Sequence, residues 1–119
     1  MIVFLKPELA EGFMYLRKQS LQLASKMRFL AAQMEALLQD ELWRGLAAAI
    51  SELPGVRVTH PVESNAVFAT LPRQAIEALR AQFAFYVWDE ARDEVRWMCS
   101  WDTTEDDIER LVSAARAVL

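Results

Sequence analysis

The dipeptide Pro54-Gly55 divides the sequence into two stretches with different hydrophobic periods. Before it, apolar residues recur every three or four positions, as they do on one face of an α-helix. After it, apolar and polar residues alternate along short runs, which is typical of β-strands with one buried face. Helices followed by a mixture of strands and helices favour the α+β class.

The residues before Pro54 predict one short strand and several helices. The expected elements are a buried strand over 2–5, a short helix from Pro7, a long helix over about 19–38 and a helix over 41–52. Asp40 is the expected N-cap of the last of these, because its carboxylate can accept a hydrogen bond from a free backbone N–H. The side of this helix expected to be buried consists of Trp43, Leu46, Ala47 and Ile50.

The residues after Gly55 predict the order β-β-α-β-β-α. The expected strands cover 56–60, 65–71, 85–88 and 94–100, with one helix opening at Pro72 and another near the C-terminus. Asp102 or Thr103 is expected to cap the last helix, with Glu105 three residues after Asp102 in a capping-box-like arrangement. This order predicts a small, largely antiparallel sheet with helices packed on one face.

We expect residues 1–119 to form a single domain. Within it, 1–18 is interpreted as a linker, 19–53 as a helical segment and 54–119 as a small α+β subdomain.

Composition excludes several function classes. The net charge of −4 and the pI near 5.0 argue against a nucleic-acid partner, which would require a broad positive surface. No apolar run approaches the roughly 20 residues needed to cross a membrane. The single Cys99 cannot form an internal disulfide, which favours a reducing, cytoplasmic location. With His60 as the one histidine, far from Cys99 in the sequence, no metal site is expected.

Arg96 stands out because it lies in a predicted strand among bulky apolar residues. Arginine is rarely buried without an anion, and its planar guanidinium suits a carboxylate bound through two hydrogen bonds. Two interpretations are open. Arg96 either binds a carboxylate ligand or faces outward and pairs with Glu94 or Asp93.

A second candidate site is the stretch 17–33, where cationic side chains interrupt an apolar, amide-rich segment of an acidic chain. Its cations are Arg17, Lys18, Lys26 and Arg28. From the residues alone, this stretch is an amphipathic helix with a basic end.

The same stretch, Arg17–Gln33, resembles the low-specificity L-threonine aldolases, which are pyridoxal-phosphate-dependent enzymes of the aspartate aminotransferase fold. Further segments resemble the family in the same order along the chain, and together they cover nearly all of it. These segments are Leu42-Trp43, Glu63–Phe68, Phe85–Trp88 and Val95–Thr104.

The resemblance implies a fold, a reaction and roles for individual residues. It implies the small C-terminal domain of a pyridoxal-phosphate-dependent lyase that cleaves β-hydroxy-α-amino acids to glycine and an aldehyde, with its active site at a dimer interface. Arg96 matches the arginine that binds the α-carboxylate of the amino-acid substrate. Lys18 and Arg28 match basic residues near the cofactor phosphate, Lys18 as the candidate catalytic residue and Arg28 as the candidate cofactor-binding residue.

The chain departs from the family in two respects. In the family, the lysine that binds the cofactor belongs to a large domain upstream. The lysines of this chain are Lys6, Lys18 and Lys26, and none of them lies in a stretch that resembles the sequence around that lysine. The helix around Arg44–Leu46 is shorter than in the family. We therefore expect a C-terminal portion that is inactive as an isolated chain, with 1–18 as the linker from the large domain.

An alternative from another class is a non-catalytic α+β module that self-associates through exposed Trp, Met and Phe side chains on the helices of 21–50. Both interpretations predict a homo-oligomer.

Overall fold

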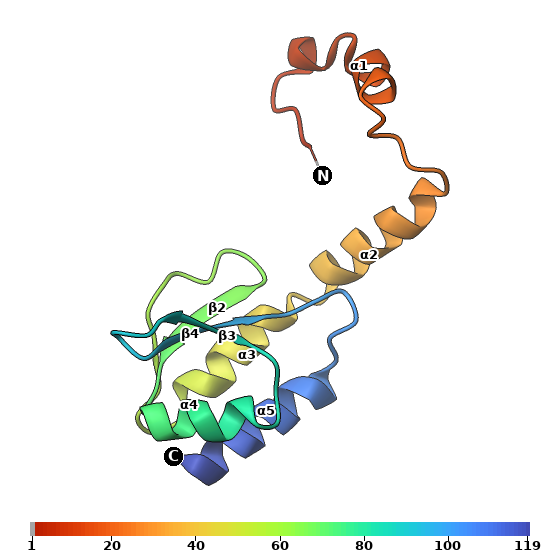
Figure 1. The fold of residues 1–119 in the computed structure, drawn as a ribbon. Helices are drawn as coiled ribbons and strands as arrows, with labels where there is room; N and C mark the ends of the chain where they lie inside the picture. Colours follow the sequence, from red (N-terminus) through yellow and green to blue (C-terminus); the bar gives the residue numbers. More distant parts are fainter. Residues whose placement is uncertain (1) are drawn as a thin grey trace. The chain divides into compact units, whose positions relative to one another are not determined.

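The computed structural model describes residues 2–119, so Met1 lies outside the described part of the chain (Figure 1). The chain divides into two compact units, 1–32 and 33–119, and the boundary falls within helix α2 (Met27–Gln39). No helix among the described residues combines the length and the apolar character that a membrane span requires. The expected division into 1–18, 19–53 and 54–119 stays a prediction.

The first unit contains a short 3₁₀ helix, η1 (Pro7–Ala10), and helix α1 (Phe13–Gln19). Gly12 separates them with a φ of 72°, a left-handed conformation that glycine adopts without strain. The strand predicted over 2–5 is wrong, since these residues form no strand and Ile2 is 67% exposed. A strand needs a neighbour for its backbone hydrogen bonds, and the described chain provides none there.

The long helix predicted over 19–38 is confirmed over 27–38, where α2 lies, but not over 20–26, because α1 ends at Gln19 and α2 begins only at Met27. Leu21 has a φ of 56°, and its N–H donates to the carbonyl of Lys18 at 3.2 Å. The N–H of Gln22 donates to the carbonyl of Arg17 at 3.0 Å. These bonds form a Schellman motif, which closes α1 with a non-glycine residue in the left-handed position.

The second unit is built on a four-stranded sheet in the order β1-β2-β4-β3, with every neighbouring pair antiparallel. Its strands are β1 (Arg57–Val58), β2 (Ala66–Thr70), β3 (Tyr86–Asp89) and β4 (Glu94–Met98). Gly55, two residues before β1, adopts a φ of 79°. This left-handed conformation favours glycine, which explains the glycine after Pro54. The predicted α+β class with a small antiparallel sheet is confirmed.

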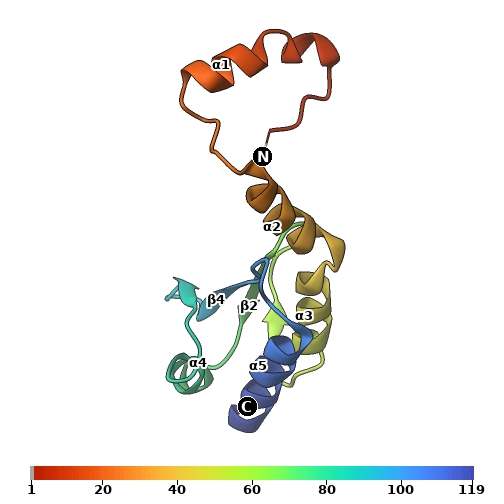
Figure 2. The same ribbon diagram turned by 90° about the vertical axis from the view of Figure 1, so that its right-hand side faces the viewer.

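Three helices of this unit, α3 (Leu42–Ser51), α4 (Arg73–Arg80) and α5 (Glu105–Val118), lie on the same side of the sheet (Figures 1 and 2). Helix α5 packs against both α3 and α4. The predicted buried side of α3, including Trp43 and Ile50, is confirmed. The core between helices and sheet consists of Trp43, Leu46, Ala47, Ile50, Leu53, Val67, Ala69, Leu71, Ala75, Ile76, Leu79, Val95, Trp97, Cys99, Leu111 and Ala115.

Both predicted helix caps are displaced along the chain. Glu41, not Asp40, is the N-cap of α3, with a left-handed φ of 44° and no side-chain capping bond. Thr104, not Asp102 or Thr103, caps α5, and it forms a reciprocal capping box with Asp107. Asp102, Thr103 and Thr104 can all accept the required bond, so residue type alone could not select among them.

Candidate functional site

Side-chain alternation gives the sheet two different faces. Val67 and Val95 point toward the helices and are fully buried, whereas Phe68 and Arg96 occupy the alternate positions of the same strands. On the edge strand β3, Tyr86 lies opposite Arg96 in the register and therefore on the same face. We call Phe68, Tyr86, Trp88 and Arg96 the open-face cluster, because no helix of this unit covers them.

Arg96 lies at the centre of the open-face cluster. It is paired in register with Phe68 on β2 and with Tyr86 on β3. Its guanidinium carbon lies 5.4 Å from the centroid of the Tyr86 ring and 5.0 Å from that of Trp88. The Phe68 and Trp88 rings meet edge to face at 5.3 Å. These contacts fix the guanidinium by cation–π attraction, which is strongest with tryptophan.

The guanidinium of Arg96 has no carboxylate partner among residues 2–119, and its buried Nε has no hydrogen-bond acceptor there. The alternative pairing with Glu94 or Asp93 is therefore not observed. Glu94 contacts His60 instead, and Asp93 lies 3.6 Å from Arg73. A planar cation with free donors, held in contact with two aromatic rings, is suited to binding a carboxylate.

Glu94 and His60 extend the site along β4 toward β1. Glu94 is only 5% exposed, and its Oε1 lies 3.3 Å from Nε2 of His60. The His60 ring in turn packs on Phe68, with centroids 4.8 Å apart. A continuous series of contacts thus runs from Glu94 through His60, Phe68 and Trp88 to Arg96.

Lys18 and Arg28, the other two residues singled out from the sequence, belong to the first unit. Lys18 lies in the last turn of α1 and is exposed. Arg28 lies in the first turn of α2, with its guanidinium carbon 4.9 Å from the centroid of the Phe29 ring. Neither has an ion-pair partner within the described chain, so both side chains are available to an external group.

Sequence reasoning found Arg96 but missed the residues that hold it. Tyr86 and Trp88 occupy alternate positions of a predicted strand, so they were expected on the same face of the sheet. This alternation was the one signal in the sequence that could have identified them. Their contact with Arg96 depends on β3 pairing with β4, which no local pattern specifies.

Cys99 is not a candidate nucleophile, because burial raises the pKa of its thiol and keeps it protonated.

Comparison with known proteins gives a consistent result over the whole chain, although no family model matches. The chain is 46% identical over 129 aligned positions to the low-specificity L-threonine aldolase of Pseudomonas aeruginosa, covering 98% of this chain and 36% of that protein. It is 40% identical over 130 positions to the enzyme of the same name from a Pseudomonas species, covering 99% of this chain and 37% of that protein.

Both alignments are longer than the 119 residues of this chain, so each relative carries positions that have no counterpart here. The chain spans little more than a third of the length of each relative. By sequence, nearly the whole chain is therefore similar to about a third of each of these two low-specificity L-threonine aldolases.

Proposed function

We propose that this chain is the C-terminal portion of a pyridoxal-phosphate-dependent lyase that cleaves β-hydroxy-α-amino acids to glycine and an aldehyde. The observation that carries the proposal is the guanidinium of Arg96, which contacts the rings of Tyr86 and Trp88 and has no carboxylate partner among residues 2–119. It occurs in a chain 46% identical to an L-threonine aldolase.

In this proposal Arg96 binds the α-carboxylate of the amino-acid substrate through two parallel hydrogen bonds. The two aromatic rings that contact the guanidinium restrict it before the substrate arrives, so less conformational entropy is lost on binding. Lys18 is proposed as a catalytic residue and Arg28 as a ligand of the cofactor phosphate in the complete enzyme. Both are cationic and exposed, as an anion-binding role requires.

The residues of this chain do not by themselves fit pyridoxal phosphate. Its lysines, Lys6, Lys18 and Lys26, are all exposed and all lie in the first unit. A lysine that binds the cofactor covalently is normally desolvated or placed beside another cation, which lowers its pKa and makes the amine nucleophilic. We therefore propose that the isolated chain is catalytically inactive.

Borohydride reduction tests this point directly. The chain is incubated with pyridoxal phosphate, reduced and digested, and labelled lysines are mapped by mass spectrometry, while threonine cleavage is assayed in parallel. The proposal expects weak labelling spread over the exposed lysines and no cleavage. Labelling of one lysine together with turnover by the isolated chain would refute the claim of inactivity.

We further propose that the protein is a cytoplasmic homo-oligomer. Large apolar side chains are exposed in the first unit, with Leu5 at 92% and Leu21 at 89%. Surfaces of this kind favour association, because burying them removes apolar area from water. Sedimentation velocity over a wide range of protein concentration should show a dimer or larger species, and a strictly monomeric chain would contradict this proposal.

A further inference from the structure

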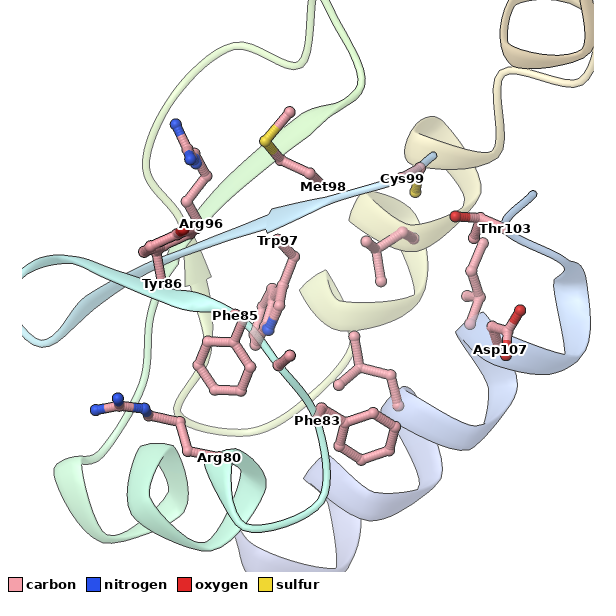
Figure 3. A pocket seen from close by; sticks show the side chains of 14 residues that line it. Arg80, Phe83, Phe85, Tyr86, Arg96, Trp97, Met98, Cys99, Thr103 and Asp107 are labelled. Carbon is pink, nitrogen blue, oxygen red and sulfur yellow. The ribbon is translucent and has the colours of Figure 1, made fainter. Parts of the chain in front are cut away.

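The second unit contains a cavity of about 610 Å³ on the side of the sheet that carries the helices (Figure 3). Tyr86, Arg96 and Met98 border it, but the side chains of Arg96 and Met98 point to the opposite side of β4 from Trp97. The cavity thus adjoins Tyr86 and Arg96 of the open-face cluster but lies on the other side of the sheet. Its volume lies within the range of small-molecule sites.

Most of the cavity wall is apolar and partly aromatic. Phe85 and Trp97 form one wall, with ring centroids 5.8 Å apart, and α5 contributes aliphatic side chains opposite them. The large apolar side chains on this side of the sheet that line it include Leu46, Phe83, Phe85, Trp97, Ile108 and Leu111. This lining can accept one aromatic ring or a short aliphatic chain.

One polar group in this wall has no partner. Trp97 is only 4% exposed, and its indole Nε1 is buried with no hydrogen-bond acceptor among the described residues. Buried indole N–H groups normally find an acceptor. Because Nε1 has almost no solvent-accessible surface, a ligand in the cavity contacts the ring of Trp97 and not this nitrogen.

The charges at the two ends of the cavity favour an anionic ligand. Asp107, from the first turn of α5, is already bonded to Thr104 and lies 3.4 Å from Arg110. Arg80, from the last turn of α4, lies across the lined space from Asp107 and has no ion-pair partner in the described chain (Figure 3). The uncompensated charge bordering the cavity is therefore positive.

We propose that this cavity binds a small carboxylic acid with an aromatic or aliphatic body. The body packs among Phe83, Phe85 and Leu111 and against the ring of Trp97, and Arg80 attracts the negative charge. This site does not depend on aldolase activity, and it is distinct from the proposed carboxylate site at Arg96.

Indole resonances of the ¹⁵N-labelled chain provide a specific test, with 3-phenylpropionate as the probe. The Trp97 indole N–H should shift in a saturable manner, with a Kd of about 1 mM for a ligand of this size. Trp43 is the internal control, because its Nε1 is also buried without an acceptor but does not line the cavity. Parallel, non-saturating shifts of both indoles would overturn the proposal.

Charge dependence is tested with ligands and variants. The cation 3-phenylpropylamine should bind more weakly than the carboxylate. Arg80→Gln should weaken carboxylate binding about two- to fivefold, the effect expected of an exposed charge. Arg116→Gln removes an exposed charge of α5 that does not border the cavity, and it should have no effect. Equal binding of both ligands, or no effect of Arg80→Gln, would overturn the role of Arg80.

Two further variants separate this site from the open face. Ala84 borders the cavity and is exposed, so Ala84→Trp should obstruct the cavity without disturbing the core, and binding should be lost. Trp88→Ala changes the open face but not the cavity lining, and it should leave the Trp97 shift unchanged. If 3-phenylpropionate instead shifts the indole of Trp88 and its binding disappears in Trp88→Ala, the ligand occupies the open face and the proposal is wrong.

Discussion

The guanidinium carbon of Arg96 lies 5.0 Å from the centre of the Trp88 ring, on a sheet face that the helices of its unit leave open. The two residues are on adjacent antiparallel strands, and Trp88 is 54% exposed. Their contact therefore contributes little to the core. Its main effect is to orient a cation that has no carboxylate partner among residues 2–119.

A double-mutant cycle should measure this orientation as a coupling energy. Trp88→Ala and Arg96→Ala are each expected to lower the free energy of unfolding slightly, and their coupling should be about 0.5–1 kcal/mol in urea titrations. Trp101 is similarly exposed, at 51%, but the guanidinium of Arg96 does not lie over its ring. A cycle between Trp101 and Arg96 should give no coupling. Equal coupling in both cycles would show that the effect is not specific to Trp88.

The core should depend on α3, which the sequence predicted well. Ile50 is completely buried, so Ile50→Ala should lower the free energy of unfolding by about 2–5 kcal/mol through lost burial and the resulting cavity. Leu38, on α2, is 51% exposed, and Leu38→Ala should change the free energy of unfolding by less than about 0.5 kcal/mol. A small effect of Ile50→Ala would mean that α3 does not pack as described.

The position of the α5 cap gives a sharp test between prediction and structure. Thr104→Ala removes an oxygen that accepts the backbone N–H of Asp107 at 3.2 Å, and it should destabilise the chain by about 1 kcal/mol. Asp102→Ala removes one of the two residues that the sequence predicted as the cap, and it should have little effect. Thermal or urea unfolding of the two variants decides between the two positions.

Acid should weaken the same cap. The hydroxyl of Thr104 donates to Asp107 at 2.8 Å and its backbone N–H donates at 3.1 Å, which together lower the pKa of Asp107 below its ordinary value of 3.8. Because the folded-state pKa is the lower one, this contribution to stability is complete above the unfolded-state pKa. It is lost as the pH falls through the folded-state pKa.

The stability difference between the wild-type chain and Asp107→Asn should therefore be present at pH 7 and should shrink at pH 2.5, as measured by urea midpoints. An NMR titration of the Asp107 carboxyl gives the folded-state pKa itself. A difference between the two chains that is independent of pH would contradict this assignment.

The sequence predicted what depends on local patterns. Alternation and turn residues located β2, β3 and β4, and helical spacing identified the buried side of α3 around Trp43 and Ile50. The break between α1 and α2 escaped, because the apolar period continues through Leu23 and Met27 although the chain turns at Leu21. A left-handed leucine has no signature in a hydrophobic pattern.

The candidate site was predictable only in part, for a related reason. Arg96 is conspicuous as a cation among apolar neighbours in its own strand. Its contacts with Tyr86 and Trp88 arise from the pairing of β3 with β4, and the contact of Glu94 with His60 joins residues far apart in the sequence. Sheet order and register create these contacts, and single-strand patterns do not encode them.

The proposed role of Arg96 is tested in a chimera in which residues 1–119 replace the matching segment of the Pseudomonas aeruginosa relative. If the chimera cleaves threonine, Arg96→Gln should lower kcat/KM roughly 10- to 100-fold, which is the loss expected when hydrogen bonds between charged groups disappear. Arg96→Lys keeps the charge but not the planar pair of donors, so it should restore only part of the activity.

Arg92→Gln is the matched control, because Arg92 is an exposed arginine that lies 3.6 Å from Asp89 in the turn before β4. An Arg96→Gln chimera as active as its parent would exclude Arg96 from carboxylate binding. The stacking on Trp88 would then serve the stability of the open face alone.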